Sequence, residues 1–147
     1  NQWYFGMKAH IGTDSQSKLI HSVAFTAANV HDSQVLAHLL HGKETRVWGD
    51  SAYAGQTAVI KAYAPNALDF THHKATRNNL LSKASKSKVP AKVEHAFLII
   101  KRIFGFAKVR YRGLKKNANR LFVTCALANL YRVRHQLLRL QRDRCVQ

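Results

Sequence analysis

Asp50 and Glu94 are the two residues of this chain whose type and setting could support chemistry. The chain has 24 Lys and Arg against 7 Asp and Glu, which gives a formal net charge of +17. In such a positive field an isolated carboxylate stays ionised. Two carboxylates brought together would bind a hard divalent cation through oxygen ligands. Such a cation activates water or a hydroxyl group and neutralises the charge on a leaving oxygen, as phosphoryl transfer requires.

The other five acidic residues each have a structural explanation, so they are set aside by elimination. They are Asp14 in a turn, Asp32 at a predicted helix N-cap, Glu44 in a loop after Gly42, Asp69 in a short strand, and Asp143 near the end of the sequence. Asp50 and Glu94 remain as the candidate catalytic and metal-binding residues.

Each of the two candidates also has an ordinary structural alternative. Asp50 follows a predicted buried strand, at the place where open α/β sheets bind ligands, but it could instead cap a turn or the next helix. Glu94 lies on a predicted helix, and Lys101, seven residues later, returns to the same face at about 100° per residue. The alternative for Glu94 is an ion pair with Lys101, or with a nearby Lys, on a solvated face.

Periodicity predicts the elements that must position these residues. Residues 3–11 and 19–26 have strand patterns and are joined by a turn cluster, which predicts a β-hairpin. A helix is expected to begin with Asn29 or Asp32 as its N-cap and to end at Gly42. A buried strand at 45–49, a helix at 57–63 and a strand at 67–71 follow. This order indicates an α/β fold with a mixed sheet.

The second half of the chain has a different character. Residues 72–88 are basic, polar and poor in apolar side chains, which indicates a linker or a weakly ordered arm. A helical pattern follows at 89–104, and a long helix is expected at 118–140. We therefore expect one domain over residues 1–147, with an α/β part at 1–71, a basic linker at 72–88 and a helical part at 89–147. The core stripe of the long helix is expected to comprise Leu121, Phe122, Cys125, Leu127 or Ala128, Leu130 and Tyr131.

The charge of the chain indicates a polyanionic partner, and nucleic acid is the commonest one. Many cations lie between positions 74 and 120, where Glu94 is the only acid, so phosphate contacts are expected there. No window approaches 18 uninterrupted apolar residues, so no membrane span is predicted. The nine histidines include no convincing zinc ligand set, and Cys125 and Cys145 are expected to be reduced thiols rather than a disulfide framework.

Four blocks of sequence resemble the transposases with a DDE motif that bacterial insertion sequences encode, of the IS-five-type and IS-four-like groups. The blocks are NQWYFGMKAHIG, LIHSVAFTAANVHD, VWGDSAYAG and KVEHAFLIIKRIFGFAKVRYRGL. They extend through most of the chain, and the last two are specific in combination. The resemblance implies an RNase H-like fold, a mixed sheet with flanking helices followed here by a long C-terminal helix. In that family two Asp and one Glu gather around two Mg²⁺ ions.

The resemblance also implies roles for individual residues. Asp50, in GDSAY, matches the second catalytic Asp, and Glu94, in VEHAF, matches the catalytic Glu. Lys101 matches a Lys that contacts the DNA backbone. Mg²⁺ or Mn²⁺ is the implied cofactor, and DNA at transposon ends and targets is the implied partner. The DNA-binding residues are expected to be Lys101, Arg102, Lys92, Lys88, Arg110 and Arg112. A homodimer in the DNA complex and a bacterial cytoplasmic, nucleoid-associated location are also implied.

Two departures from the family pattern affect these expectations. Ser87 and Pro90 stand where the family places a Tyr and an Arg before the Glu. In addition, the family's first catalytic Asp lies on a first strand, upstream of the strand expected near Trp3. The earliest acid here is Asp14, in the hairpin turn. We therefore expect a chain that lacks the first strand and is an incomplete, inactive fragment of a DNA strand transferase. The alternative is a basic DNA-binding module without catalysis, for which neither a metal nor Asp50 would matter beyond charge.

Overall fold

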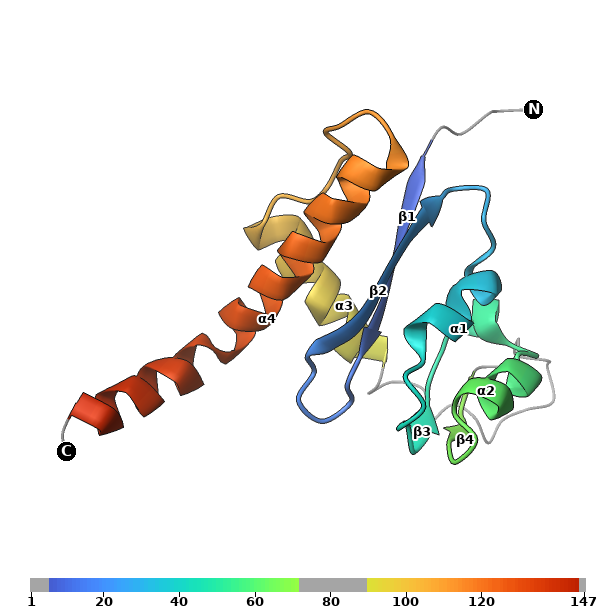
Figure 1. Cartoon of the computed structure of the whole chain (residues 1–147), viewed down its shortest axis with the longest axis horizontal. Coiled ribbons are helices and arrows are strands. Elements are labelled where there is room, and N and C mark those ends of the chain that lie inside the picture. The colour runs from blue at the N-terminus through green and yellow to red at the C-terminus, as the bar shows by residue number, and fades with distance from the viewer. Residues whose placement is uncertain (1–5, 72–89, 146–147) are drawn as a thin grey trace.

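The computed structural model describes residues 6–71 and 90–145, and they form a mixed α/β structure (Figure 1). Its elements are β1 (Met7–Thr13), β2 (Ile20–Ala27), the 3-10 turn η1 (Asp32–Val35), α1 (Leu36–Leu39), β3 (Arg46–Val47), the 3-10 turn η2 (Ser51–Tyr53), α2 (Thr57–Tyr63), β4 (Leu68–Asp69), α3 (Pro90–Leu98), the π-helix η4 (Ile99–Ile103) and α4 (Leu114–Cys145). The predicted linker, residues 72–88, lies outside the described residues.

The predicted β-hairpin is confirmed. β1 and β2 pair antiparallel, with Met7 opposite Ala27, and the register shifts at a bulge between Gly12 and Thr13. The turn between them is held by Asp14, whose Oδ2 accepts hydrogen bonds from the backbone N–H and the hydroxyl group of Ser17 at 2.6 and 2.7 Å. A carboxylate that accepts neighbouring N–H groups in this way stabilises a turn.

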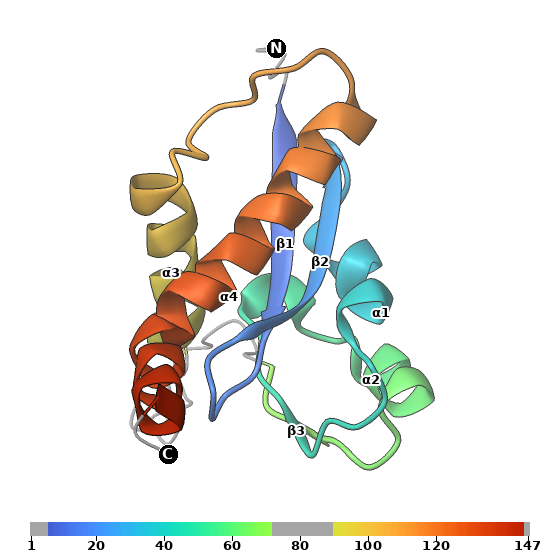
Figure 2. The ribbon, with the colours of Figure 1, turned by 60° about the vertical axis from the view of Figure 1, so that its left-hand side comes forward.

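The expectation of a single mixed sheet is not met by the described strands. β1 and β2 form one antiparallel pair, while β3 and β4 form a separate parallel pair of two residues each. No described strand joins β1 to β3. Helices α3 and α4 cover one side of the hairpin, and α1 with the β3–α2–β4 unit lies on the other side (Figures 1 and 2).

Each side of the hairpin has its own hydrophobic core. The larger core includes Leu121, Cys125 and Ala128 of α4, packed with residues of β1, β2, α3 and η4. The smaller core is formed by Leu36, Val47 and Ile60. Burial also raises the pKa of the Cys125 thiol to about 11, so this cysteine is an unreactive core residue.

The long helix is longer than predicted, and part of its predicted core stripe is wrong. Leu121 and Cys125 are buried and Tyr131 packs beside them, and of the two alternatives Leu127 and Ala128 it is Ala128 that is buried, whereas Phe122 and Leu130 are exposed. The buried positions follow the i, i+4, i+7 spacing of one helix face, and Leu130 falls on the opposite side. The sequence pattern did not distinguish the two faces because both are apolar.

The helix predicted to end at Gly42 needs correction at both ends, since α1 already ends at Leu39. Neither Asn29 nor Asp32 is the N-cap of the first helical segment. His31 has that position, and its Nδ1 accepts a hydrogen bond from the Ser33 N–H at 3.3 Å. Asp32 instead pairs with Lys8, which lies 24 residues away. The helix predicted at 57–63 is confirmed by α2.

Candidate active site

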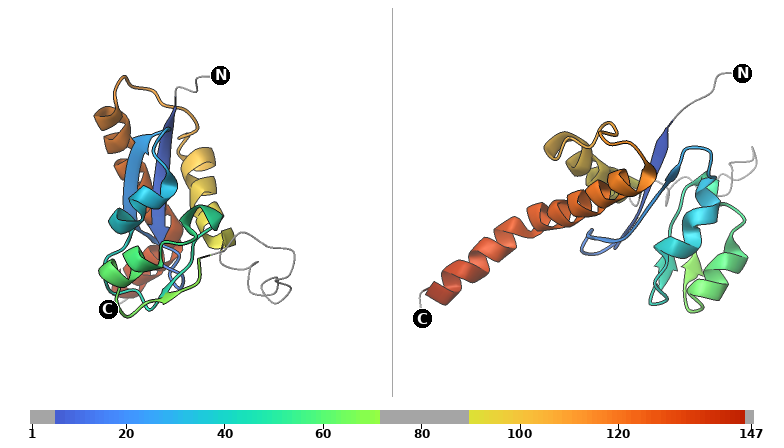
Figure 3. Two further views of the ribbon diagram at one scale, coloured as in Figure 1. Left: turned by 90° about the vertical axis from the view of Figure 1, so that its right-hand side faces the viewer. Right: turned by 45° about the horizontal axis from the view of Figure 1, so that its top comes forward.

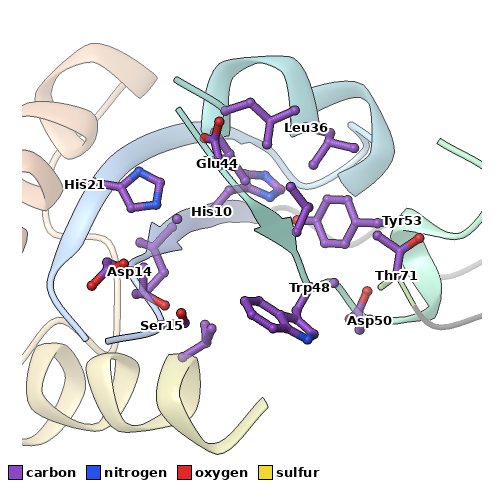
Figure 4. Close-up of a pocket in the computed structure, with 18 of the residues that line it drawn as sticks. His10, Asp14, Ser15, His21, Leu36, Glu44, Trp48, Asp50, Tyr53 and Thr71 are labelled. Carbon is purple, nitrogen blue, oxygen red and sulfur yellow. The ribbon is translucent and has the colours of Figure 1, made fainter. Parts of the chain in front are cut away.

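A cavity of about 540 Å³ lies between β1, β3, η2 and α3 (Figure 4). Five of the seven acidic residues line it, in a chain whose net charge is +17. These residues are Asp14, Asp32, Glu44, Asp50 and Glu94. A concentration of carboxylates in one cavity of a basic protein creates a local environment that favours cations.

Three of the five carboxylates already form an ion pair or accept hydrogen bonds. Lys8 Nζ lies 2.9 Å from Asp32 Oδ1. Glu44 accepts hydrogen bonds from the backbone N–H groups of His41 and Gly42 at 2.7 and 2.8 Å. Asp14 accepts the hydrogen bonds of its own turn, which lower the pKa of its carboxyl group, the Ser17 hydroxyl contributing most. These three carboxylates therefore have structural roles.

Only one carboxylate oxygen of Asp50 accepts a hydrogen bond from a described residue. Asp50 follows β3 directly and serves as N-cap of η2, where its Oδ1 accepts the Ala52 N–H at 2.9 Å. The side chain is exposed, and its second oxygen has no hydrogen-bond partner among the residues that the structure describes. The structural alternative considered for Asp50, capping of a turn, is thus present, and one oxygen remains for another ligand.

Glu94 is the least engaged of the five. It is exposed on α3, and within the described ranges no ion pair or hydrogen bond involves its carboxylate. Lys101 does not pair with Glu94, and its Nζ lies instead over the ring of Phe97, 5.7 Å from the centroid. The nearby Lys88 and Lys92 have no described side chains, so a pair of Glu94 with either of them stays a prediction. Within residues 6–71 and 90–145, the Glu94 carboxylate and one oxygen of Asp50 are thus the groups of this cavity that no described side chain occupies.

The two available carboxylates fit a hard divalent cation in their chemistry but do not complete a site. Mg²⁺ and Mn²⁺ prefer oxygen ligands, and Mg²⁺ is commonly held by one or two carboxylates together with water and substrate phosphates. No group of three potential ligands from His, Cys, Asp and Glu occurs among residues 6–71 and 90–145. A complete set of three carboxylates would need a further donor.

Tyr53 and Gly49 support the loop of Asp50, and the sequence did not identify either of them. Tyr53 is half-buried beside the smaller core, and its pKa is raised to about 12, mainly by burial and further by the charges of Asp32 and Asp50. A Cβ atom at position 49 would lie 3.1 Å from the Tyr53 ring and 3.3 Å from Thr71. Glycine at this position lets Tyr53 and Thr71 pack directly against the backbone before Asp50 (Figure 4).

Basic residues line a second cavity of about 970 Å³, which Glu94 borders as well. Lys101 and Arg102, from the π-helix, are exposed there, together with Lys108. Two of the residues expected to bind DNA cannot be placed: Lys88 lies outside the described residues, and the side chain of Lys92 on α3 is not described. Carboxylate and cationic groups therefore meet where the two cavities adjoin at Glu94.

The other expected DNA-binding residues, Arg110 and Arg112, are exposed in the loop before α4. Asn117 is fully buried and fixes this loop. Its Oδ1 accepts the N–H groups of Arg110 and Tyr111, and its Nδ2 donates to the carbonyl groups of Tyr111 and Gly113. No sequence pattern indicated this role, because an Asn near a helix start is common.

The chain belongs to the family described as the Transposase DDE domain, whose profile matches residues 1–130. This match confirms the resemblance found in the sequence at the level of the family. The family generally uses divalent metal ions and acts on DNA. No solved structure matches the chain. None of the described helices combines the length and the apolar composition that a membrane span requires.

Proposed function

We propose that the chain provides part of the catalytic site of an insertion-sequence transposase, with Asp50 and Glu94 holding Mg²⁺ or Mn²⁺. The observation that carries this proposal is their position. Both line one acidic cavity, and they are its least engaged carboxylates. When bound, the cation would supply an activated water or hydroxyl group and stabilise the leaving oxygen during strand cleavage and strand transfer.

The chain's own residues bind and orient the DNA. Lys101 and Arg102 border the cavity that adjoins Glu94, where their charges attract the backbone phosphates. Arg110 and Arg112 extend this basic surface along the loop that Asn117 fixes. The phosphodiester is thereby held close to the carboxylates without any reading of base sequence.

We further propose that the chain by itself is catalytically incomplete. Asp14, the earliest acid in the sequence, is engaged in the hairpin turn and does not replace the family's first Asp. The cavity also separates the edges of β1 and β3, and no backbone hydrogen bond joins these strands in the described part of the chain. A central strand of an RNase H-like sheet that carries the missing carboxylate would occupy this space.

Binding of duplex DNA with and without Mg²⁺ tests this proposal against the alternative, a basic DNA-binding module. If Asp50 and Glu94 hold a metal that also contacts phosphate, Mg²⁺ raises the affinity of the wild type for a labelled duplex above its affinity in EDTA, at constant ionic strength. Asp50→Asn and Glu94→Gln remove this gain, and Asp143→Asn, which makes the same change of charge outside the cavity, keeps it.

The alternative, a basic DNA-binding module, predicts that Mg²⁺ lowers the affinity for DNA. For a purely basic module, Mg²⁺ competes with Lys and Arg for the phosphates and weakens binding. It does so equally in the wild type and in all three variants. That result, measured by fluorescence anisotropy, would leave DNA binding without a metal site as the function of the chain.

A further inference from the structure

Residues 107–116, hereafter the 107–116 segment, form a continuous exposed surface that includes the loop before α4 and the first turn of that helix. Figures 2 and 3 show the loop arching from the end of η4 to the start of α4, at one end of the hairpin. The segment contains no acid. Its cations are Lys108, Arg110, Arg112, Lys115 and Lys116. Its large apolar side chains, Val109, Tyr111 and Leu114, are interspersed with these cations and are exposed. Such a mixture favours a nucleic acid, because phosphates bind cations and bases stack on aromatic rings.

Arg120 anchors the first part of the 107–116 segment to α4. Its guanidinium group donates to the carbonyl groups of Gly105 and Lys108 at 3.1 and 3.0 Å, and it lies over the Phe106 ring, 4.7 Å from the centroid. Phe106 in turn packs against the larger core. Asn117 fixes the second part through its four hydrogen bonds to the backbone. The backbone of the segment is therefore already ordered, and binding a ligand costs little further conformational entropy.

Tyr111 combines a fixed backbone with an uncovered ring. Asn117 binds both the N–H and the carbonyl group of Tyr111, at 3.2 and 2.6 Å. In the described part of the chain, no ring contact, cation–π contact or hydrogen bond involves the Tyr111 side chain. The ring of Phe106, five residues earlier, has both an aromatic and a cationic neighbour. An aromatic ring that is held in place but left uncovered between Arg110 and Arg112 fits a ligand with flat apolar faces and negative charge.

The 107–116 segment continues the basic wall of the second cavity. Lys108 and Val109 line that cavity together with Lys101 and Arg102. Tyr111 follows Val109 by two residues, which span at most about 7 Å. This length is about two base steps at 3.4 Å per step. A DNA strand held by the cations of the cavity would therefore reach the Tyr111 ring after about two further nucleotides.

We propose that Tyr111 stacks on an unpaired base of the DNA while Arg110 and Arg112 contact phosphates beside it. Stacking needs the face of a base, which neighbouring base pairs cover inside a duplex and which is open in a single strand. Every base has such a face, so this contact selects unpaired DNA rather than a particular sequence. The inference deepens the proposed function by naming the form of DNA that the site prefers, and it rests on that function only in that DNA is the ligand.

Binding of labelled DNA in EDTA tests the proposal. The probes are a single-stranded oligothymidine and a duplex with G·C pairs at its ends and the same number of phosphates, compared by fluorescence anisotropy at constant ionic strength. Tyr111→Ala should weaken binding to the single strand about fivefold or more, the effect of one stacked base. It should leave binding to the duplex within about twofold. Tyr111→Phe, which keeps the ring, should bind both probes as the wild type does.

Tyr63 provides the matched control. Its exposure of 55% is close to the 52% of Tyr111, and it lies on α2, outside both cavities. Tyr63→Ala should leave binding to both probes within about twofold of the wild type. If Tyr111→Ala weakens binding to the two probes equally, or changes neither more than Tyr63→Ala does, the proposal is overturned. Because no metal is present, failure of the proposed metal site would not alter these results.

Photochemical cross-linking tests the contact itself. Irradiation of a single strand that carries 5-iodouracil attaches the DNA to an aromatic side chain in stacking contact with that base. Mass spectrometry should locate the attachment at Tyr111 in the wild type, and Tyr111→Ala should lose it. Attachment at other residues with none at Tyr111 would contradict the proposed stacking.

Discussion

At the scale of single residues, the acidic side chains differ in whether they have a hydrogen-bond or ion-pair partner. Asp14, Asp32 and Glu44 each have a partner within hydrogen-bonding distance. Asp50 uses one oxygen for the η2 turn. Glu94 is without a partner in the described part of the chain. The same carboxylates that elimination selected in the sequence are thus the available ones in the cavity, and their role in binding a metal is a prediction.

His10 gives a pH-dependent prediction at this scale. It is buried, its Nε2 lies 2.9 Å from Thr26 Oγ1, and its pKa is lowered chiefly by burial. The folded state therefore binds a proton less readily than the unfolded state. This contribution to stability is complete above about pH 6.5, the ordinary value for histidine, and is lost as the pH falls below it.

Thermal unfolding at pH 7.5 and 5.5 checks this prediction. The wild type should lose stability at the lower pH. His10→Gln, which can keep a hydrogen bond to Thr26 but has no titrating group, should lose less. An equal fall in Tm for both proteins would show that His10 does not contribute to the pH dependence.

At the scale of elements, local sequence patterns predicted most helices and strands, and contacts over long sequence distances determined the rest. The hairpin and α2 follow from periodicity and turn residues. The π-helix Ile99–Ile103, which carries Lys101 and Arg102, has no marker that we recognised in the sequence. The ion pair between Lys8 and Asp32 spans 24 residues, and no local pattern encodes it.

The two apolar faces of α4 show why the core could be predicted only in part. A period of 3.6 residues identifies Leu121, Cys125 and Leu130 equally well as apolar helix positions. Only packing against β2 decides that Cys125 is buried and Leu130 exposed. The sequence therefore predicted the helix, while the choice of its buried face required the tertiary structure.

Asn117 gives a prediction at the scale of the loop before α4. Asn117→Ala removes four hydrogen bonds between a buried side chain and the loop backbone, and it leaves buried polar groups unsatisfied. It should lower the free energy of unfolding by about 2–4 kcal/mol and weaken DNA binding by disordering Arg110 and Arg112. Chemical denaturation measures the first effect.

Asn119→Ala is the matched control for this prediction, because Asn119 is exposed two residues later on the same helix. Its effect on stability should be within about 0.5 kcal/mol. If Asn117→Ala is as mild as Asn119→Ala, the loop does not depend on the Asn117 side chain.

At the scale of the whole molecule, charge is unevenly distributed. Five of the seven acids line one cavity, while exposed cations border the adjoining cavity and the loop before α4. A polyanion is attracted to the basic surface and a cation to the acidic cavity. This arrangement suits an enzyme that must bring a metal ion and a phosphodiester together.

The salt dependence of DNA binding is the prediction at this scale. Lys101→Gln and Arg102→Gln should each reduce the slope of log K against log salt concentration by about 1, and they should weaken binding equally for different DNA sequences. Lys61→Gln, an exposed cation on α2 that lines neither cavity, should change the slope much less. Equal slopes for all three variants would argue against a localised DNA-binding surface.

Asp50 and Glu94 are proposed to bind one divalent cation together in the acidic cavity. Calorimetric titration of the chain with Mn²⁺ tests it directly, with Asp50→Asn, Glu94→Gln and the control Asp143→Asn alongside. We predict that the wild type and Asp143→Asn bind Mn²⁺ with similar affinity, and that either substitution in the cavity reduces the affinity at least tenfold. A folded wild type that binds no Mn²⁺, or whose binding survives both cavity substitutions, would contradict a metal site formed by Asp50 and Glu94.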